Sequence, residues 1–190
     1  MSERLGTGDS GPGFVVWLTG LSGAGKSTLA NLLADHLGGL GVDCQVLDGD
    51  EVRMNLSRDL GFSREDRDTN IRRIAYVAGL LSQHGVAAIV AAISPYTEAR
   101  EGAREAVKRF VEVHVDCTLD ELVRRDPKGL YGRALAGGIS HFTGVSDPYE
   151  APECPEVYVD SRRDTPGKSL EIIVQRLEEM ELIPRMGADL

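Results

Sequence analysis

The sequence predicts an α/β fold in which a doubly wound, mainly parallel sheet carries helices on both faces. Apolar, strand-like runs alternate with helical patterns along its 190 residues. The run 86–93 lacks polar alternation, as expected of a strand buried on both faces. A glycine-rich turn lies between the first apolar run and an amphipathic helix. We therefore expect ligand groups to gather at the carboxyl ends of the strands.

The elements follow in regular order. The strand-like runs are 14–19, 44–48, 86–93, 111–115 and 156–159, and the helical patterns are 25–38, 66–84, 97–109, 118–125 and 167–181. We predict one domain over 14–184, with flexible tails at 1–13 and 185–190. Between about 126 and 155, Gly and Pro recur among basic residues, which favours a mobile lid over the site.

The composition excludes several classes of protein. The formal net charge of −9 argues against a nucleic-acid surface and against attachment to an anionic membrane. An anionic substrate must therefore meet local clusters of Arg and Lys. Three separated cysteines are typical of a reducing compartment, and no segment has the pattern of a signal peptide or a membrane span. We expect a cytoplasmic protein.

The glycine-rich turn matches the phosphate-binding pattern G-x-x-x-x-G-K-[ST] in full. It consists of Gly20, Leu21, Ser22, Gly23, Ala24, Gly25, Lys26 and Ser27. Glycines allow backbone N–H groups to turn toward an anion, Lys26 can reach the terminal phosphates, and the Ser27 hydroxyl can hold Mg²⁺. The helix that follows adds the positive end of its dipole. The pattern predicts a bound nucleoside triphosphate.

A second signal follows the second strand, in the segment Leu-Asp-Gly-Asp-Glu-Val-Arg from Leu47. Asp48 and Asp50 project on the same side of an extended segment, where a carboxylate could accept a proton or hold a water on Mg²⁺. Arg53 supplies charge for an anionic substrate. For Asp48, a helix-cap role stays equally open, whereas for Asp50 with Arg53 we favour a role in the site.

Two further segments have more than one interpretation. Arg67 and Asn70 share a helix face, and from the residues alone we prefer a solvated charged surface. Ser94, after the buried run, could bond substrate, accept phosphate or begin the next helix. Asp116 could replace the carboxylate that is missing after that run, although a position in the N-cap region of the next helix is favoured.

The segment 124–133, which leads into the predicted lid, carries four basic residues, Arg124, Arg125, Lys128 and Arg133. Cations that close over transferring phosphates stabilise developing charge and exclude water. Phe142 follows within the predicted lid, where an exposed aromatic ring would cover something such as a base.

Taken together, these segments resemble the adenylylsulfate kinase family from about Gly13 to Pro184. The motifs are Gly-Leu-Ser-Gly-Ala-Gly-Lys-Ser-Thr from Gly20, Leu-Asp-Gly-Asp-x-Val-Arg from Leu47, Asp-Leu-Gly-Phe-Ser from Asp59, Asp-Arg-x-x-Asn-Ile-Arg-Arg from Asp66, Ile-Ser-Pro-Tyr from Ile93, Arg-Asp-Pro-Lys-Gly-Leu-Tyr from Arg125, Phe-Thr-Gly from Phe142 and Pro-Tyr-Glu-x-Pro from Pro148.

The resemblance implies transfer of the ATP γ-phosphate, with Mg²⁺, to the 3′-hydroxyl of adenosine 5′-phosphosulfate (APS), giving 3′-phosphoadenosine 5′-phosphosulfate (PAPS) in sulfate assimilation. It extends the ATP site to Thr28 and Arg133. It assigns the acceptor to Asp48, Asp50, Arg53, Phe62, Arg67, Asn70, Ile93, Ser94, Lys128, Leu130 and Phe142, with Phe62 and Phe142 sandwiching adenine. It thereby overturns the surface interpretation of Arg67 and Asn70.

The same resemblance implies catalytic roles for Lys26, Asp50, Ser94 and Lys128. Asp50 would be a base or a metal-linked carboxylate, so that Ser27 and Asp50 are the metal residues. Ser94 matches a serine that carries phosphate as an enzyme intermediate, although direct in-line transfer needs only positioning and charge stabilisation. The resemblance also makes a homodimer plausible.

The chain departs from the usual family pattern around the acceptor, at Glu51, Met54, Asn55, Thr69, Ala91, Ala92 and Thr97. The phosphate loop is intact. The alternatives are therefore a related kinase that phosphorylates another nucleotide or alcohol, and a nucleotide-binding regulator without catalytic activity.

Overall fold

The computed structural model describes residues 12–126 and 128–185. Five strands form one sheet: β1 (Val15–Thr19), β2 (Cys44–Asp48), β3 (Ala87–Ala91), β4 (Phe110–Asp116) and β5 (Val157–Asp160). Their order is β2-β3-β1-β4-β5, and every pair of neighbours is parallel. All five residues of β3 are buried between β2 and β1. The predicted parallel sheet and its doubly buried strand are confirmed.

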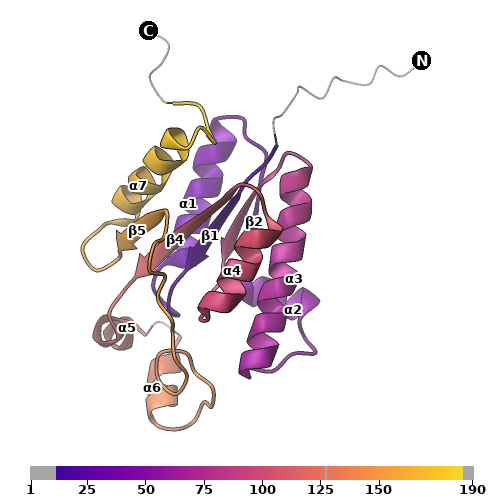
Figure 1. Ribbon diagram of the computed structural model, residues 1–190. Helices are drawn as coiled ribbons and strands as arrows, with labels where there is room; N and C mark the ends of the chain where they lie inside the picture. The colour runs from indigo at the N-terminus through magenta and orange to yellow at the C-terminus, as the bar shows by residue number, and fades with distance from the viewer. Residues whose placement is uncertain (1–11, 127, 186–190) are drawn as a thin grey trace.

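Helices cover both faces of the sheet, as Figure 1 shows. On one face lie α1 (Lys26–Gly39) and α7 (Pro166–Glu179), and on the other lie α3 (Arg64–Gln83) and α4 (Thr97–Ala106). Strand β1 serves both layers because successive side chains alternate. Val16 and Leu18 join the core under α1 and α7, whereas Val15 and Trp17 join the core under α3 and α4. The buried β1 therefore fixes the phosphate loop that follows it.

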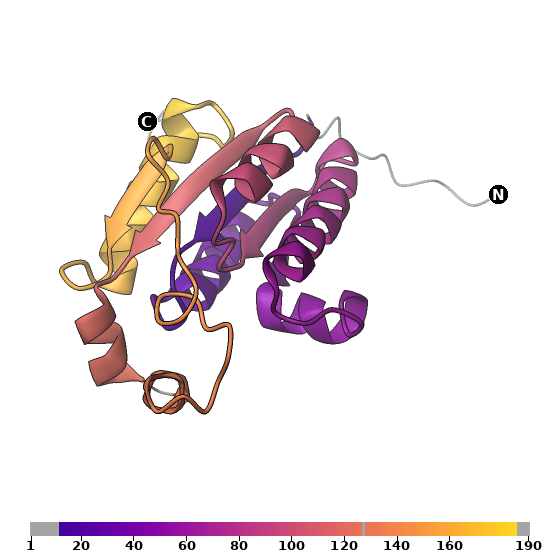
Figure 2. The same cartoon turned by 60° about the horizontal axis from the view of Figure 1, so that its bottom comes forward.

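Three shorter helices lie near the carboxyl ends of the strands: α2 (Gly49–Leu56), α5 (Leu119–Arg125) and α6 (Leu130–Leu135). We did not predict α2, which begins directly after β2 and is too short for a clear periodicity, or α6. Helix α6 lies inside the predicted lid, and its Tyr131 is 2% exposed. The predicted lid is therefore partly a packed element rather than an irregular segment throughout (Figure 2).

The ends of the described chain are attached to the domain. The Gly13 N–H, which we had assigned to the flexible tail, donates to the Ser82 carbonyl at 3.0 Å. Residues 1–11 of that predicted tail and 186–190 of the other lie outside the described residues. No helix within 12–126 or 128–185 is long and apolar enough to cross a membrane.

Candidate active site

The phosphate loop joins β1 to α1 and depends on glycine at two positions. Gly20 has φ +149°, and a Cβ there would lie 2.3 Å from the Val115 carbonyl oxygen of β4. Gly25, with φ +105°, caps the N-terminus of α1 in a left-handed conformation. Residues other than glycine rarely adopt these backbone conformations. The loop therefore presents its backbone at the start of a 14-residue helix, a favourable place for an anion.

Lys26 is the first residue of α1 and is almost fully buried. Its ammonium group donates to the carbonyl oxygens of Gly20 and Leu21, at 2.8 Å each. Burial lowers the pKa of Lys26 from 10.5 to about 8, although the carboxylates of Asp48 and Asp50 act in the opposite direction. Phosphate groups at the loop would favour the charged form further.

The two aspartates after β2 contact opposite sides of the cleft. Asp48 accepts the Ser27 hydroxyl at 2.5 Å and caps α2 by accepting the Asp50 backbone N–H at 2.9 Å. The helix-cap interpretation is therefore confirmed, and the same carboxylate faces the phosphate loop. Asp50 accepts the Lys128 ammonium group at 2.9 Å. Lys128 thereby brings the predicted lid against α2.

A pocket of about 210 Å³ lies between the phosphate loop, α2, α3 and the segment after β3. Most predicted site residues line it together: Ser22, Gly23, Lys26, Ser27, Asp48, Asp50, Arg53, Phe62, Arg67, Asn70, Ile93, Ser94 and Lys128. Four of them are cations, although the chain as a whole is acidic. The pocket therefore has the local positive charge that an anionic nucleotide requires.

Two arginines flank the exposed ring of Phe62 at the mouth of the pocket. The guanidinium of Arg53 lies 4.5 Å from the ring centroid, and that of Arg67 lies 5.6 Å away. Arg53 donates to the Gly61 carbonyl at 2.7 Å, and Arg67 donates to the Phe62 carbonyl at 3.0 Å. Burial and the neighbouring charge of Arg67 lower the pKa of Arg53. An anion between the two would relieve their mutual repulsion.

Arg67 and Asn70 do not form a solvated charged face, so the interpretation drawn from the residues alone is wrong. Arg67 is 8% exposed and Asn70 is 7% exposed. Arg67 also donates to the His141 carbonyl of the segment after α6. Asn70 lines the pocket, and its buried side-chain oxygen has no hydrogen-bond partner among the described residues. Because such orphaned acceptors are costly, this atom points to a donor on a ligand.

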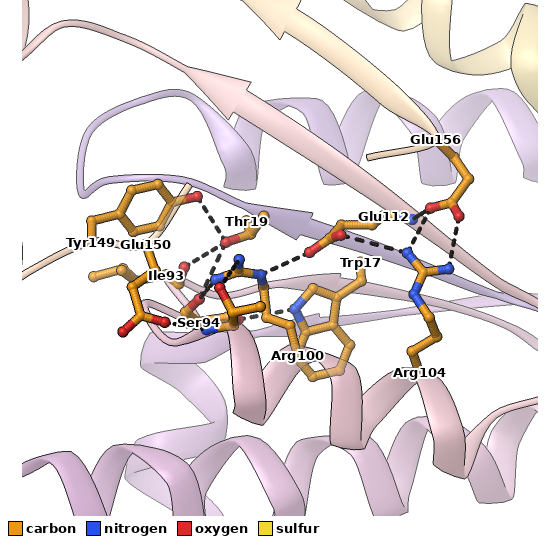
Figure 3. Close-up of polar contacts among 11 residues, drawn as sticks. Trp17, Thr19, Ile93, Ser94, Arg100, Arg104, Glu112, Tyr149, Glu150 and Glu156 are labelled. Atoms are coloured by element: carbon orange, nitrogen blue, oxygen red, sulfur yellow. Dashed lines mark hydrogen bonds and ion pairs between the residues drawn. The ribbon is translucent and has the colours of Figure 1, made fainter. Parts of the chain in front are cut away.

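Ser94 lies in the pocket wall in an unusual conformation. Its φ is +46°, its side chain is almost fully buried, and its hydroxyl accepts the Trp17 indole N–H at 2.9 Å. The Thr19 hydroxyl donates to the neighbouring Ile93 carbonyl at 2.7 Å, and Arg100 donates to the Ser94 carbonyl at 2.8 Å (Figure 3). Ser94 is therefore held as part of the wall and does not begin α4, whose N-cap is Tyr96.

Several predicted residues lie outside this pocket. Phe142 is half-buried, packs edge-on against Tyr131 at 5.0 Å and does not line the pocket that Phe62 lines. Leu130 and the exposed Arg133 lie on α6 and do not line the pocket. Asp116 accepts the Tyr158 hydroxyl at 2.7 Å, and the N-cap of α5 is Thr118.

A second cavity of about 270 Å³ lies on the other side of the phosphate loop. Its lining includes Ala24, Gly25 and Thr28, together with Arg125, one of the basic residues singled out in the sequence, and Ser161, Asp164 and Ser169, which we did not predict. Arg125 donates to the Ser161 carbonyl at 2.8 Å. Polar residues recur after the last strand, and this is the signal in the sequence that could have indicated a second cavity. Only the fold, however, places 161–169 beside α1.

Together, the doubly wound sheet and the phosphate loop with its buried lysine define a nucleotide-binding protein of the P-loop class. The family model described as adenylylsulphate kinase matches residues 12–160. The chain belongs to this family.

Sequence relatives and solved structures of the same family are similar to this chain. The adenylyl-sulfate kinase of Myxococcus xanthus is 54% identical over 93% of this chain and 97% of its own length. A probable bifunctional SAT/APS kinase 2 of Sorangium cellulosum is 58% identical over 93% of this chain, which spans 30% of that protein. The Mycobacterium tuberculosis APS kinase CysC, solved in complex with AMPPNP and APS, is 42% identical, with a TM-score of 0.85 over 88% of this chain and 98% of that chain.

Proposed function

We propose that the chain is an adenylyl-sulfate kinase, which transfers the γ-phosphate of ATP to the 3′-hydroxyl of APS and forms PAPS in sulfate assimilation. The observation that carries the proposal is the single pocket in which the phosphate loop faces Arg53, Arg67 and Asn70. One wall suits a triphosphate, and the other suits an anionic acceptor. The similarity to the Myxococcus xanthus adenylyl-sulfate kinase, 54% identity over 97% of that protein's length, supports it.

ATP occupies the phosphate loop, from Gly20 to Thr28, with its terminal phosphates toward Lys26. Its nucleoside extends into the second cavity, where Arg125 and the segment 161–169 meet the start of α1. This arrangement favours a γ-phosphate near the start of α1, where the consecutive residues Gly25 and Lys26 line one cavity each. Arg133, exposed on α6, lines neither cavity, and we assign it to ATP in the state in which the predicted lid has closed.

The residues present fit Mg²⁺. The Ser27 hydroxyl and the carboxylates of Asp48 and Asp50 are oxygen ligands at the mouth of the pocket, and Mg²⁺ in such sites prefers one or two carboxylates plus phosphate oxygens. Ser27 and Asp50 would hold the ion directly or through water. The ion would neutralise charge on the β- and γ-phosphates.

APS occupies the other half of the pocket. Arg53 and Arg67 balance its anionic phosphosulfate, Phe62 offers a face for the base, and the Asn70 oxygen accepts from it. Ile93 and Ser94 form the wall behind it. Leu130 and Phe142 join the acceptor if the lid, which we assign to about 126–155, closes further.

Catalysis requires few steps from the protein itself. Asp50 orients the acceptor hydroxyl and takes its proton or holds a metal-linked water, while Lys26 and Lys128 stabilise charge on the transferring phosphoryl group. In-line transfer needs no covalent intermediate. Ser94 is poorly placed for one, because its buried hydroxyl already accepts from Trp17.

The departures from the usual family pattern lie mostly outside the pocket. Among them, Ala91 and Ala92 line it, whereas Glu51, Thr69 and Thr97 do not. The Thr69 hydroxyl accepts from Arg72, and the Thr97 hydroxyl accepts from Arg100. This placement favours APS over another acceptor.

We also propose that residues 14–184 act as one domain, in the cytoplasm and as a homodimer. One core joins β1, α1, α7 and Ile183, and the three cysteines are free thiols. Exposed apolar side chains gather on α2 and α3, namely Met54, Leu56, Tyr76 and Leu80. Sedimentation velocity tests the dimer, with a shift to monomer expected for Tyr76→Glu.

Incubation of the purified protein with ATP, Mg²⁺ and APS, followed by mass spectrometry and NMR of the product, tests the activity. We expect the mass of PAPS, with phosphate on the 3′-oxygen. Phosphate on a different acceptor supplied in parallel, and none on APS, would favour the related-kinase alternative. Nucleotide binding without any transfer would favour the regulator.

A further inference from the structure

Arg100 is a buried cation that touches neither cavity. It lies on α4, is 2% exposed, and uses three different nitrogen atoms for three contacts. Its Nε donates to Glu112 of β4 at 2.8 Å and one terminal nitrogen donates to the Ser94 carbonyl at 2.8 Å (Figure 3). The other terminal nitrogen donates to the Thr97 hydroxyl at 3.2 Å. A guanidinium can fix three acceptors at once because its donors form a rigid planar fork.

The partner carboxylate is buried as well. Glu112 is 5% exposed and lies opposite Trp17 in the sheet. It also accepts Arg104 at 3.5 Å, and Arg104 forms a second ion pair with Glu156 at 2.7 Å. Burial of such a pair is costly and often contributes little net stability, so a purely stabilising role does not account for it well.

The Ser94 carbonyl, to which Arg100 donates, belongs to the wall of the acceptor pocket. Ser94 has φ +46°, a conformation that persists in a residue other than glycine when its surroundings hold it. Three groups hold it from behind: Trp17 at its hydroxyl, Thr19 at the preceding carbonyl and Arg100 at its own carbonyl. Its other side faces the pocket between Ile93 and Pro95.

We propose that Arg100 is a positioning residue for the acceptor nucleotide: anchored on Glu112, it fixes the Ser94 carbonyl and with it the wall against which APS binds. The proposal rests on the function proposed above. It predicts an effect on the acceptor and little effect on ATP, because the ATP phosphates contact the loop 20–27, which Arg100 does not touch.

The test uses steady-state kinetics of Arg100→Lys, which keeps the charge beside Glu112 but loses the fork. We expect the KM for APS to rise about tenfold, the size expected for losing one charge-assisted hydrogen bond, with the KM for ATP unchanged and kcat little changed. The matched control is Arg104→Lys, which alters the same ion-pair cluster without reaching Ser94 and should leave both KM values unchanged.

Trp17→Phe provides a second variant that acts on the same wall from β1. It keeps the stacking on Phe110, at 5.7 Å, and removes the N–H that reaches Ser94. It should also raise the KM for APS selectively. If Arg100→Lys does not fold, an unchanged KM for APS in Trp17→Phe overturns the proposal, because the wall at Ser94 would then not govern APS binding.

An unchanged KM for APS in the folded variants would overturn the proposal, as would parallel losses for both substrates in proportion to a lower Tm. Wild type, measured beside them, separates the two hypotheses. Absence of transfer to APS by wild type contradicts the proposed function, whereas normal wild-type transfer with unaffected variants contradicts only the role of Arg100.

Discussion

The ammonium group of Lys128 lies 2.9 Å from the carboxylate of Asp50, although the two residues are 78 positions apart in the chain. Asp50 belongs to α2, which follows the second strand, and Lys128 lies two residues before α6. Both side chains are largely exposed, at 79% and 64%. Because an exposed ion pair contributes little stability, the value of this contact lies in where it places the two charges.

Lys128→Met should lower kcat about 100-fold, because it removes a cation from the transferring phosphoryl group. Stability should change by less than about 1 kcal/mol, as expected for an exposed pair. Steady-state kinetics and thermal unfolding measure the two effects.

Arg176→Met is the control, since Arg176 forms a partly exposed pair with Glu179 at 3.2 Å on α7 and lines neither cavity. It should leave kcat unchanged. Equal losses in the two variants, or a kcat for Lys128→Met that matches wild type, would show that Lys128 has no part in the transfer.

Lys26 should make ATP binding sensitive to pH. Its pKa of about 8 in the ligand-free protein means that it loses its charge as pH rises through 8, and kcat/KM for ATP should fall there. At saturating ATP, kcat should fall less, because bound phosphate favours the charged form. A kcat/KM profile for ATP that stays flat to pH 9.5 would contradict the lowered pKa.

The lowered pKa of Lys26 affects stability in the opposite direction from ATP binding. Between pH 8 and 10.5 the unfolded chain binds more protons at Lys26 than the folded chain does, so the free energy of unfolding should rise with pH. Urea titrations of wild type and Lys26→Met across this range isolate that contribution, since the variant lacks the group.

Asn70→Ala should raise the KM for APS about tenfold and leave the KM for ATP unchanged, because the variant removes the amide oxygen that accepts a hydrogen bond from APS. The Tm should not fall as it would for a buried hydrogen-bonded amide, since this oxygen has no partner within the described chain. Asn55→Ala, an exposed amide on α2, serves as control. A drop in Tm with an unaffected KM for APS would show that the side chain is purely structural.

Ser94→Ala should keep kcat within about tenfold of wild type, because in-line transfer needs positioning rather than a phosphorylated serine. It should lower stability by about 1–3 kcal/mol, since the buried Trp17 N–H loses its acceptor, and raise the KM for APS. Loss of turnover comparable to that of Lys26→Ala, together with phosphate trapped on Ser94 in wild type, would refute this.

Local signals in the sequence predicted the parts of the fold that depend on neighbours along the chain. The phosphate loop is such a part, because glycine at Gly20 and Gly25 and the following helix are properties of one segment. The apolar sequence of β3 likewise predicts a strand that is buried on both faces. Both predictions follow from one segment of the chain and need no knowledge of residues that are distant in the sequence.

The remaining features depend on contacts between distant segments. Arg67 is buried because the segment after α6 packs over it and supplies the His141 carbonyl, which no helical pattern reveals. The alternation of charges on α3 was therefore misleading without the family resemblance. Arg100 and Trp17 gave no sequence signal, since only the folded chain brings both to Ser94.

The most direct test of the account is steady-state turnover of the purified wild-type protein with ATP and Mg²⁺ at micromolar APS, beside other nucleotides that carry a free 3′-hydroxyl. We predict transfer to APS with a kcat/KM well above that for any acceptor that lacks the sulfate. Binding of ATP without transfer to APS, or equal transfer to acceptors without the sulfate, would contradict the assignment of Arg53, Arg67 and Asn70 to the sulfated nucleotide.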